Sequence, residues 1–295
     1  MKSTKFLNLD CIALENESLS MLVTQSVGPR ILSFGFKDGG NLFAELPEMV
    51  SELPDGREFQ FYGGHRLWEA PETMPNTYVP DNFPVEIATL KDGLSATQRV
   101  VSQTGIEKSI EIHLKPGKAQ VVVDHLLTNR GSEIVECAPW AVTQLKPGGV
   151  ALLPQSYEQS GLLPNRSIAL WPYSDAANPL VSWGNREILV RAEMKTGSFK
   201  IGFPNPRGWL AYWLAGTLFV KRAAYNHQAQ YFDLGSSSEC YFNDRFLELE
   251  TLGPISKLQP GERATHTETW ELFQDIEEPT DHAAAQRVIE NLGLN

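Results

Sequence analysis

Apolar and polar residues alternate along most of the chain with the period of two that is typical of half-buried β-strands. The segments that show this pattern are rich in β-branched and aromatic residues and are separated by glycine-containing turns. The expected strands are Ser20–Val27, Arg30–Phe36, Thr97–Val101, Ile106–Leu114, Ala119–Leu127, Ile134–Val142, Ile188–Ala192, Phe199–Gly202, Trp209–Ala215, Leu218–Ala223, Phe246–Leu252 and Thr265–Phe273. Strands at this regular spacing predict an all-β sandwich or barrel.

One helix is expected, over residues 281–292, where Asp281 is a suitable N-cap and alanines begin a short amphipathic run. Leu46–Gln60 and Leu152–Asn185 are long and proline-rich, which predicts irregular loops that carry function or cover a site. Neither an internal repeat nor a low-complexity linker divides the chain. We therefore expect a single domain over residues 1–295.

The composition excludes some partners. The chain has 36 acidic and 25 basic residues and a net charge of −11, which argues against a nucleic-acid partner and against binding to an anionic membrane. Cys11, Cys137 and Cys240 are few and widely spaced, which favours a reducing compartment over a disulfide framework. The N-terminal residues contain no sustained apolar run, so we expect no signal peptide, no transmembrane segment and a cytoplasmic location.

The segment Tyr62–Glu72, with the sequence Y-G-G-H-R-L-W-E-A-P-E, combines groups suited to binding a sugar. Its paired glycines allow a sharp turn, and the sequence leaves open a short helical turn after them. His65 can exchange protons near neutral pH, Arg66 offers a planar set of donors, and Trp68 offers a flat apolar face. Glu72 adds a carboxylate at the end of the segment. The structural alternative is a glycine turn followed by a core tryptophan and a surface ion pair.

A second segment, Arg245–Pro254, has the sequence R-F-L-E-L-E-T-L-G-P. On a strand, Glu248 and Glu250 point to one face together with Phe246, and the leucines between them point to the other. If that face lines a cleft, crowding of the two carboxylates raises the pKa of one of them and makes it a general base. If the face is solvated, both are ordinary exposed charges.

Three further polar residues are weaker candidates for substrate contact. Arg30 begins an expected strand, Lys221 shares a strand face with Phe219, and Asn243 precedes the second segment. The remaining histidines fit structural positions, and His125 in particular shares a face with apolar neighbours. No metal-binding motif occurs, so no metal site is expected, and the signatures of acyl transfer, nucleotide hydrolysis and dinucleotide binding are missing.

In this order, the segments resemble the galactose mutarotase-like superfamily, and within it an uncharacterised family. The matching stretches are G-P-R-I at 28–31, G-G-H-R-L-W-E-A-P-E at 63–72, T-N-R-G at 128–131, F-N-D-R-F-L-E-L-E-T-L-G-P at 242–254, and L-x-P-G-E at 258–262 followed by H-T-E-T-W at 266–270. The resemblance spans nearly the whole chain. It implies one β-supersandwich domain with a sugar site on a concave sheet face, to which the residues themselves add the short helix expected at the C-terminus.

The resemblance also implies roles for individual residues. In aldose 1-epimerases a late Glu-Thr pair carries the general base, and Glu250 holds that place here. His65 is similar to the early histidine that binds the sugar, and Arg30 or Arg66 to the early arginine that contacts it. With Glu248 and Glu72 as additional ligands, a sugar site is expected around these residues.

The chain departs from the family at one position. The second histidine, which is the family's general acid, is missing after Thr128 and Asn129. Trp140 and Gln144 stand in the corresponding region and are expected to contact the sugar. His65 would then have to serve as the acid, or the protein only binds a sugar, or the reaction differs.

The expected function is that of an aldose 1-epimerase-like isomerase acting on a monosaccharide or sugar derivative. A base removes the proton of the anomeric hydroxyl, an acid protonates the ring oxygen, and the ring opens and closes again on the other face. No cofactor is expected. The alternative is a non-catalytic carbohydrate-binding protein on the same fold. The sequence specifies neither the sugar nor an oligomeric state.

Overall fold

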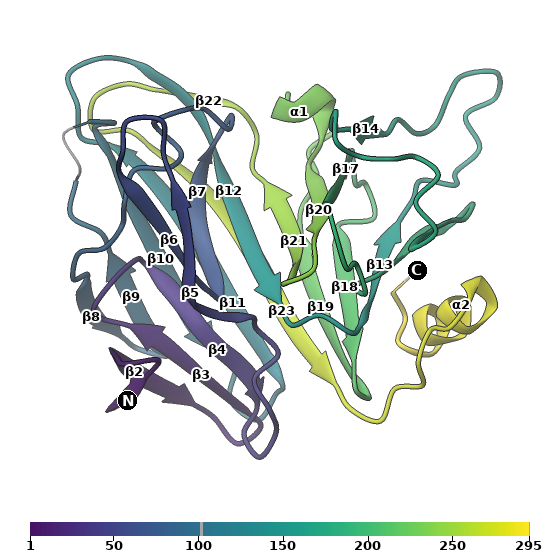
Figure 1. Cartoon of the computed structure of the whole chain (residues 1–295), viewed down its shortest axis with the longest axis horizontal. Coiled ribbons are helices and arrows are strands. Elements are labelled where there is room, and N and C mark those ends of the chain that lie inside the picture. The colour runs from purple at the N-terminus through teal and green to yellow at the C-terminus, as the bar shows by residue number, and fades with distance from the viewer. Residues whose placement is uncertain (101–102, 295) are drawn as a thin grey trace.

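Two β-sheets pack face to face in the computed structural model of the chain (Figure 1). A large apolar core is buried between them. The structure describes residues 1–100 and 103–294. Over these residues the first sheet has eleven strands, of which β22 pairs with β12 beside the main path. Its strands in spatial order are β1 (Lys2–Phe6), β2 (Leu9–Glu15), β3 (Leu19–Thr24), β4 (Arg30–Phe36), β7 (His65–Ala70), β12 (Val135–Leu145), β21 (Leu247–Leu252), β20 (Ser238–Phe242), β17 (Phe199–Phe203) and β14 (Ala169–Leu170), with β22 (Ser256–Leu258) at the side.

The second sheet has ten antiparallel strands in the same part of the chain. In spatial order they are β15 (Val181–Trp183), β16 (Glu187–Arg191), β13 (Val150–Pro154), β18 (Trp209–Leu214), β19 (Thr217–Ala223), β23 (Arg263–Phe273), β11 (Gln120–Asn129), β10 (Ile106–Leu114), β9 (Gly93–Thr97) and β8 (Glu86–Leu90). A separate hairpin joins β5 (Glu45–Glu52) and β6 (Glu58–Gly63), and a short helix α1 spans Phe232–Gly235.

The predicted C-terminal helix is confirmed as α2 (His282–Asn291), which lies beside the C-terminus in Figure 1. Asp281 is its N-cap, and its carboxylate accepts a hydrogen bond from the backbone N–H of Ala284 at 2.8 Å. The apolar side chains of Val288 and Ile289 pack on the outer face of the second sheet. None of the helices within residues 1–100 and 103–294 has both the length and the apolar character that a bilayer crossing requires.

The all-β class is confirmed, and several local predictions need correction. The strand predicted at Thr97–Val101 lies earlier, as β9, and Val101 is outside the described residues. Leu46–Gln60 is mostly a hairpin, because prolines are tolerated in such peripheral strands. No helical turn forms at Gly64–Trp68: Gly64 is a bend, and His65–Trp68 begin strand β7. There Gly64 has a φ of 75°, and a Cβ on it would lie 2.2 Å from the carbonyl oxygen of Ile31.

The central strands β7, β12 and β21 are covered on both sides, and their alternation sorts side chains onto two faces. We call the side that packs against the second sheet the core face; Leu67 and Leu249 lie there, in the same apolar cluster as Trp270. We call the opposite side the cavity face. In register across it, Val142 lies between Arg66 and Glu250.

Candidate functional site

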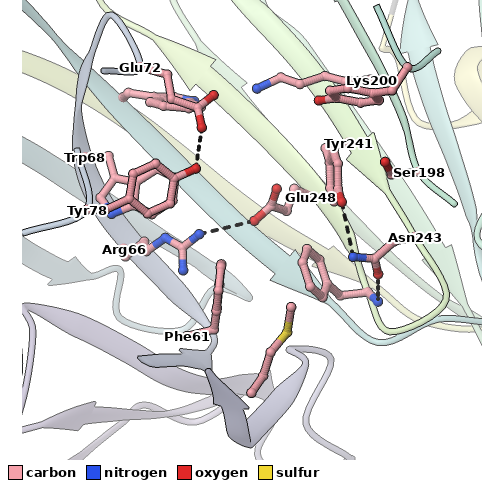
Figure 2. Close-up of a pocket in the computed structure, with 14 residues that line it drawn as sticks. Phe61, Arg66, Trp68, Glu72, Tyr78, Ser198, Lys200, Tyr241, Asn243 and Glu248 are labelled. Carbon is pink, nitrogen blue, oxygen red and sulfur yellow. Dashed lines mark hydrogen bonds and ion pairs between the residues drawn. The ribbon is translucent and has the colours of Figure 1, made fainter. Parts of the chain in front are cut away.

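A cavity of about 290 Å³ opens on the cavity face of the first sheet. Its volume is near the lower end of the range for small-molecule pockets, which suits one small ring. Strands β7, β12, β21, β20 and β17 contribute to its floor, and the β5–β6 hairpin contributes to its wall (Figure 2). The residues expected from the sequence that line it are Arg66, Trp68, Glu72, Trp140, Asn243 and Glu248. The other lining residues are Met49, Phe61, Tyr78, Tyr173, Ser198, Lys200, Tyr241 and Phe246.

Glu248 stands in the middle of the cavity, between Arg66 and Tyr241 in Figure 2. Its Oε1 accepts a hydrogen bond from Gln144 Nε2 at 2.9 Å and one from Arg66 Nη2 at 3.4 Å. Burial, followed by the nearby charge of Glu250, raises the pKa of the Glu248 carboxyl to about 7. A group with this pKa can both accept and return a proton near neutral pH.

The Arg66 guanidinium forms one side of the cavity. Its central carbon lies 3.9 Å from the centroid of the Trp68 ring and 5.2 Å from that of Phe61, so the cation is stacked on aromatic faces. Burial lowers the pKa of Arg66 to about 10, which leaves it charged at neutral pH. This cation offsets the charge of Glu248 when that carboxyl is ionised.

Glu250 shares the cavity face with Glu248, as the strand alternation predicts, but it lies behind the cavity wall and is fully buried. Its Oε2 accepts hydrogen bonds from Trp140 Nε1 at 2.7 Å and from Lys200 Nζ at 3.0 Å. The Lys200 ammonium also lies 2.7 Å from Oε2 of Glu239, which is likewise fully buried. Two buried carboxyl groups therefore share one ammonium, and the role of Glu250 as the base stays a prediction.

Polar contacts hold two further expected residues on the rim. The Tyr78 hydroxyl donates to the Glu72 carboxylate, which is exposed. Asn243 Oδ1 accepts a hydrogen bond from the backbone N–H of Phe246 at 3.0 Å, and its Nδ2 donates to the Tyr241 hydroxyl at 3.3 Å. Asn243 thus shapes the turn that carries Phe246 into the wall.

His65 does not face the cavity, and the expectation that it shares a cleft with Glu250 is wrong. It precedes Arg66 on strand β7, so alternation places it on the core face, where it is fully buried. Its Nε2 lies 2.7 Å from His125 Nε2, and its Nδ1 lies 2.8 Å from the Thr143 hydroxyl. A role for His65 as acid or sugar ligand would require it to reach through the sheet.

Hydrogen bonds assign the proton positions in this buried cluster. His125 Nδ1 lies 2.9 Å from the carbonyl oxygen of His266 and must donate to it. In the neutral ring its Nε2 is then an acceptor, so His65 Nε2 donates to it and the Thr143 hydroxyl donates to His65 Nδ1. Burial lowers the pKa of His125 to about 3 and that of His65 well below its ordinary value, consistent with two neutral rings.

Lys221 also lies on the core face and does not reach the cavity, in contrast to its expected role. It is fully buried, and its Nζ lies 2.9 Å from Glu268 Oε1, 3.0 Å from the Thr143 hydroxyl and 2.9 Å from the Leu249 carbonyl oxygen. These partners use its three protons. The ligand atoms of His65, His125 and Glu268 lie within 4.8 Å of one another, close enough for a metal ion, but hydrogen bonds already satisfy them.

Arg30 and Gln144 support the cavity without lining it. The Arg30 guanidinium forms an ion pair with Asp81, with Nη2 2.8 Å from Oδ2, and donates to the Phe61 carbonyl oxygen at 2.8 Å. The Arg30 side chain is fully buried, and its hydrogen bonds are already made to these partners. Gln144 is equally buried and orients Glu248.

Lys200 is the most important residue that sequence reasoning missed. It lies in an expected strand between Phe199 and Ile201, and a lone lysine at such a position ordinarily indicates a solvated face. The one signal that could have found it is strand alternation combined with pairing. Lys200 is paired with Tyr241, and Tyr241 with Glu248, so the three side chains point to the cavity face. The aromatic residues Tyr78 and Tyr173 come from irregular segments, whose placement no periodicity predicts.

Comparisons with known proteins address the fold. No protein-family model matches the chain, and no curated protein matches its sequence. Among solved structures, the chain is similar to a provisionally named aldose 1-epimerase from Escherichia coli K12, with a TM-score of 0.56, 14% identity, and coverage of 90% of this chain and 99% of that one. A galactose mutarotase-like protein from Lactobacillus casei ATCC 334 gives a TM-score of 0.58, 12% identity and coverage of 89% and 100%.

A further similar structure is a provisionally named aldose 1-epimerase from Klebsiella pneumoniae subsp. pneumoniae MGH 78578, with a TM-score of 0.60, 12% identity and coverage of 97% of this chain and 83% of that one. At such identities the likeness concerns the arrangement of the chain and not its chemistry. The chain therefore has the β-supersandwich fold of the galactose mutarotase-like proteins, as its sequence motifs indicated.

Proposed function

We propose that the chain binds a monosaccharide in this cavity and interconverts its anomers by acid–base opening of the ring, with Glu248 as the base. The observation that carries the proposal is a carboxyl group in the middle of the cavity whose pKa is about 7. In its ionised form Glu248 takes the proton of the anomeric hydroxyl, and it returns the proton when the ring closes.

The surroundings of Glu248 support this role. Gln144 and Arg66 both bind Oε1, and no hydrogen bond to Oε2 is found among the described residues, so Oε2 is available to the sugar hydroxyl. The flat rings of Trp68 and Trp140 offer apolar faces of the kind that stack on the C–H face of a sugar. The fold neighbours named as mutarotases and epimerases are consistent with a sugar as the ligand.

Glu250 is the competing candidate for the base, because of its place in the family motif. Glu248 is favoured since Glu250 does not line the cavity and its Oε2 already accepts two hydrogen bonds. In this proposal Glu250 is a positioning residue, which holds the Trp140 indole and the Lys200 ammonium at the cavity wall.

The test is an anomer-exchange NMR assay over a panel of free aldoses and their phosphates, with wild-type protein and the Glu248→Gln, Glu250→Gln and Glu69→Gln variants. Glu69 is a matched control, because it is a buried carboxyl on the core face of the same sheet. We expect Glu248→Gln to lower kcat by about 100-fold or more, the usual contribution of a general base, with little change in KM. The control is expected to remain near the wild-type rate.

Two results would contradict the proposal in different ways. A larger loss in Glu250→Gln than in Glu248→Gln would return the role of base to Glu250. If the wild-type protein binds a sugar but does not catalyse anomer exchange, the chain is the non-catalytic carbohydrate-binding protein of the alternative hypothesis.

A further inference from the structure

The proposed reaction needs a proton donor for the ring oxygen, and the cavity wall has no histidine among the residues that line it. Its cations are Arg66 and Lys200, and an arginine does not give up its proton in proteins. The Tyr78 hydroxyl is already donated to Glu72. Of the two cations, Lys200 is the one that can give up a proton.

Lys200 is placed for contact with a ligand although it is nearly fully buried. Figure 2 shows its side chain reaching across the cavity from the side opposite Trp68 and Glu72. Glu250 Oε2 accepts one of its three protons in a hydrogen bond at 3.0 Å, and Glu239 Oε2 lies 2.7 Å from Nζ in an ion pair. The Trp140 ring, with its centroid 4.6 Å from Nζ, holds the ammonium at the wall. One N–H is left for the ligand.

We infer that Lys200 donates the proton to the ring oxygen, and that Glu239 replaces the proton that Lys200 gives up. This inference rests on the proposed function. Glu248 takes the proton of the anomeric hydroxyl, the C1–O bond to the ring oxygen breaks, C1 becomes the carbonyl carbon, and the ring oxygen takes a proton from Lys200. Glu239 then protonates the Lys200 amine, so one proton has been gained at Glu248 and one lost at Glu239.

The environment of Glu239 supports this exchange. Burial and the nearby charge of Glu250 raise the pKa of Glu239 well above its ordinary value and outweigh the opposite effect of the Lys200 ammonium. Burial alone would lower the pKa of Lys200, but the two carboxyl groups outweigh it and hold the lysine charged. A protonated Glu239 beside a charged Lys200 acts as a proton store, that is, a group that can reprotonate the lysine. Once Glu239 has given its proton to the Lys200 amine, the Glu239 carboxylate and the Lys200 ammonium form a favourable ion pair. The charged and titratable groups around the pair are Glu250, Glu248, Asp233 and Tyr173.

The experiment measures anomer exchange by Lys200→Ala and Glu239→Gln in the full chain, with Lys108→Ala as a matched control. Lys108 is a buried lysine in an ion pair with Glu69, away from the cavity. We expect Lys200→Ala to lower kcat by about 100-fold with KM within about fivefold, and methylammonium ions added to this variant to restore part of the rate. A lysine that only supports the structure would not be rescued in this way.

Glu239→Gln preserves the shape of the side chain and tests the proton store even if Lys200→Ala fails to fold. We expect about a tenfold loss in kcat and an altered pH profile. Wild-type kcat and pH profile in Glu239→Gln would refute the role of Glu239, and kcat within about fivefold of wild type in Lys200→Ala would refute the role of Lys200. Both outcomes leave the proposed function intact, whereas a wild-type protein that exchanges no sugar would refute that function and this inference together.

Discussion

Replacing Glu248 with glutamine tests the electrostatic environment of the cavity without any substrate. The side chain is largely buried, and its carboxyl keeps its proton up to a pKa of about 7 instead of the ordinary 4.5. Glutamine keeps the shape and does not titrate. The groups that face Glu248 and affect its ionisation are Arg66, Lys200, Glu250, Tyr78 and Tyr241.

The expected effect is a stability difference that grows with pH. One pKa unit corresponds to about 1.4 kcal/mol, so the difference between 4.5 and about 7 corresponds to about 3.5 kcal/mol. Because the folded-state pKa of this acid is raised, the folded protein loses stability as the pH rises from about 4.5 to about 7. Roughly 1 kcal/mol is already lost at pH 5, which leaves about 2–3 kcal/mol to be lost between pH 5 and 8.

The assay is urea unfolding of wild-type protein and Glu248→Gln at pH 5 and pH 8. Other titrating groups are common to both proteins, so the change in their difference reports Glu248. We expect the unfolding free energy of the variant, relative to that of the wild type, to rise by about 2–3 kcal/mol from pH 5 to pH 8. Most of this rise should persist in high salt, because buried charges are weakly screened. An equal difference at both pH values would mean that Glu248 titrates as a solvated carboxyl, and the physical ground for its role as base would be lost.

Two further substitutions test the polar contacts on either side of the sheet. Lys221→Met leaves Glu268 buried without its cation, and urea unfolding should show a loss of about 3–5 kcal/mol in the free energy of unfolding. The control is Lys257→Met, which breaks the exposed ion pair with Glu136 and should cost less than about 1 kcal/mol. Trp140→Phe keeps an aromatic ring but removes the donor to Glu250; thermal and urea unfolding should show a loss of about 1–3 kcal/mol, and an unchanged stability would mean that this hydrogen bond is replaced.

Strand alternation and turn residues were enough to predict the fold class, because most strands of the sandwich carry the period-two pattern. The pattern failed at strand β7, although β17 and β21, which are also buried at every position, were predicted. Polar residues lie on both faces of β7, so His65–Ala70 shows no alternation that would identify it as a strand. The β5–β6 hairpin was missed for a different reason, since its prolines are typical of loops.

The candidate site was predicted in part. Glu248, Arg66 and Trp68 line the cavity as expected, because each lies in one of the two motifs singled out in the sequence, and strands β7 and β21 that carry them flank β12 in one sheet. Lys200 and Glu239 come from strands without a recognisable motif. Only strand register brings them to the site, since Glu239 pairs with Glu250, and Lys200 pairs with Tyr241, which pairs with Glu248. Pairing between strands far apart in the sequence is a property of the tertiary structure that local patterns do not contain.

The adjacent residues His65 and Arg66 show how strand alternation places the polar side chains of this sheet on two different faces. Since successive side chains on a strand point to opposite faces, a motif in which both are polar must place one polar group toward the core. The core here accepts it because His125, Thr143 and Lys221 complete a hydrogen-bonded cluster around His65. Arg66 on the other face is then left for Glu248 and the cavity. Any proton transfer to a ligand must therefore use groups on the cavity face. The titratable residues that line the cavity are two glutamates, three tyrosines, Arg66 and Lys200, with no histidine among them.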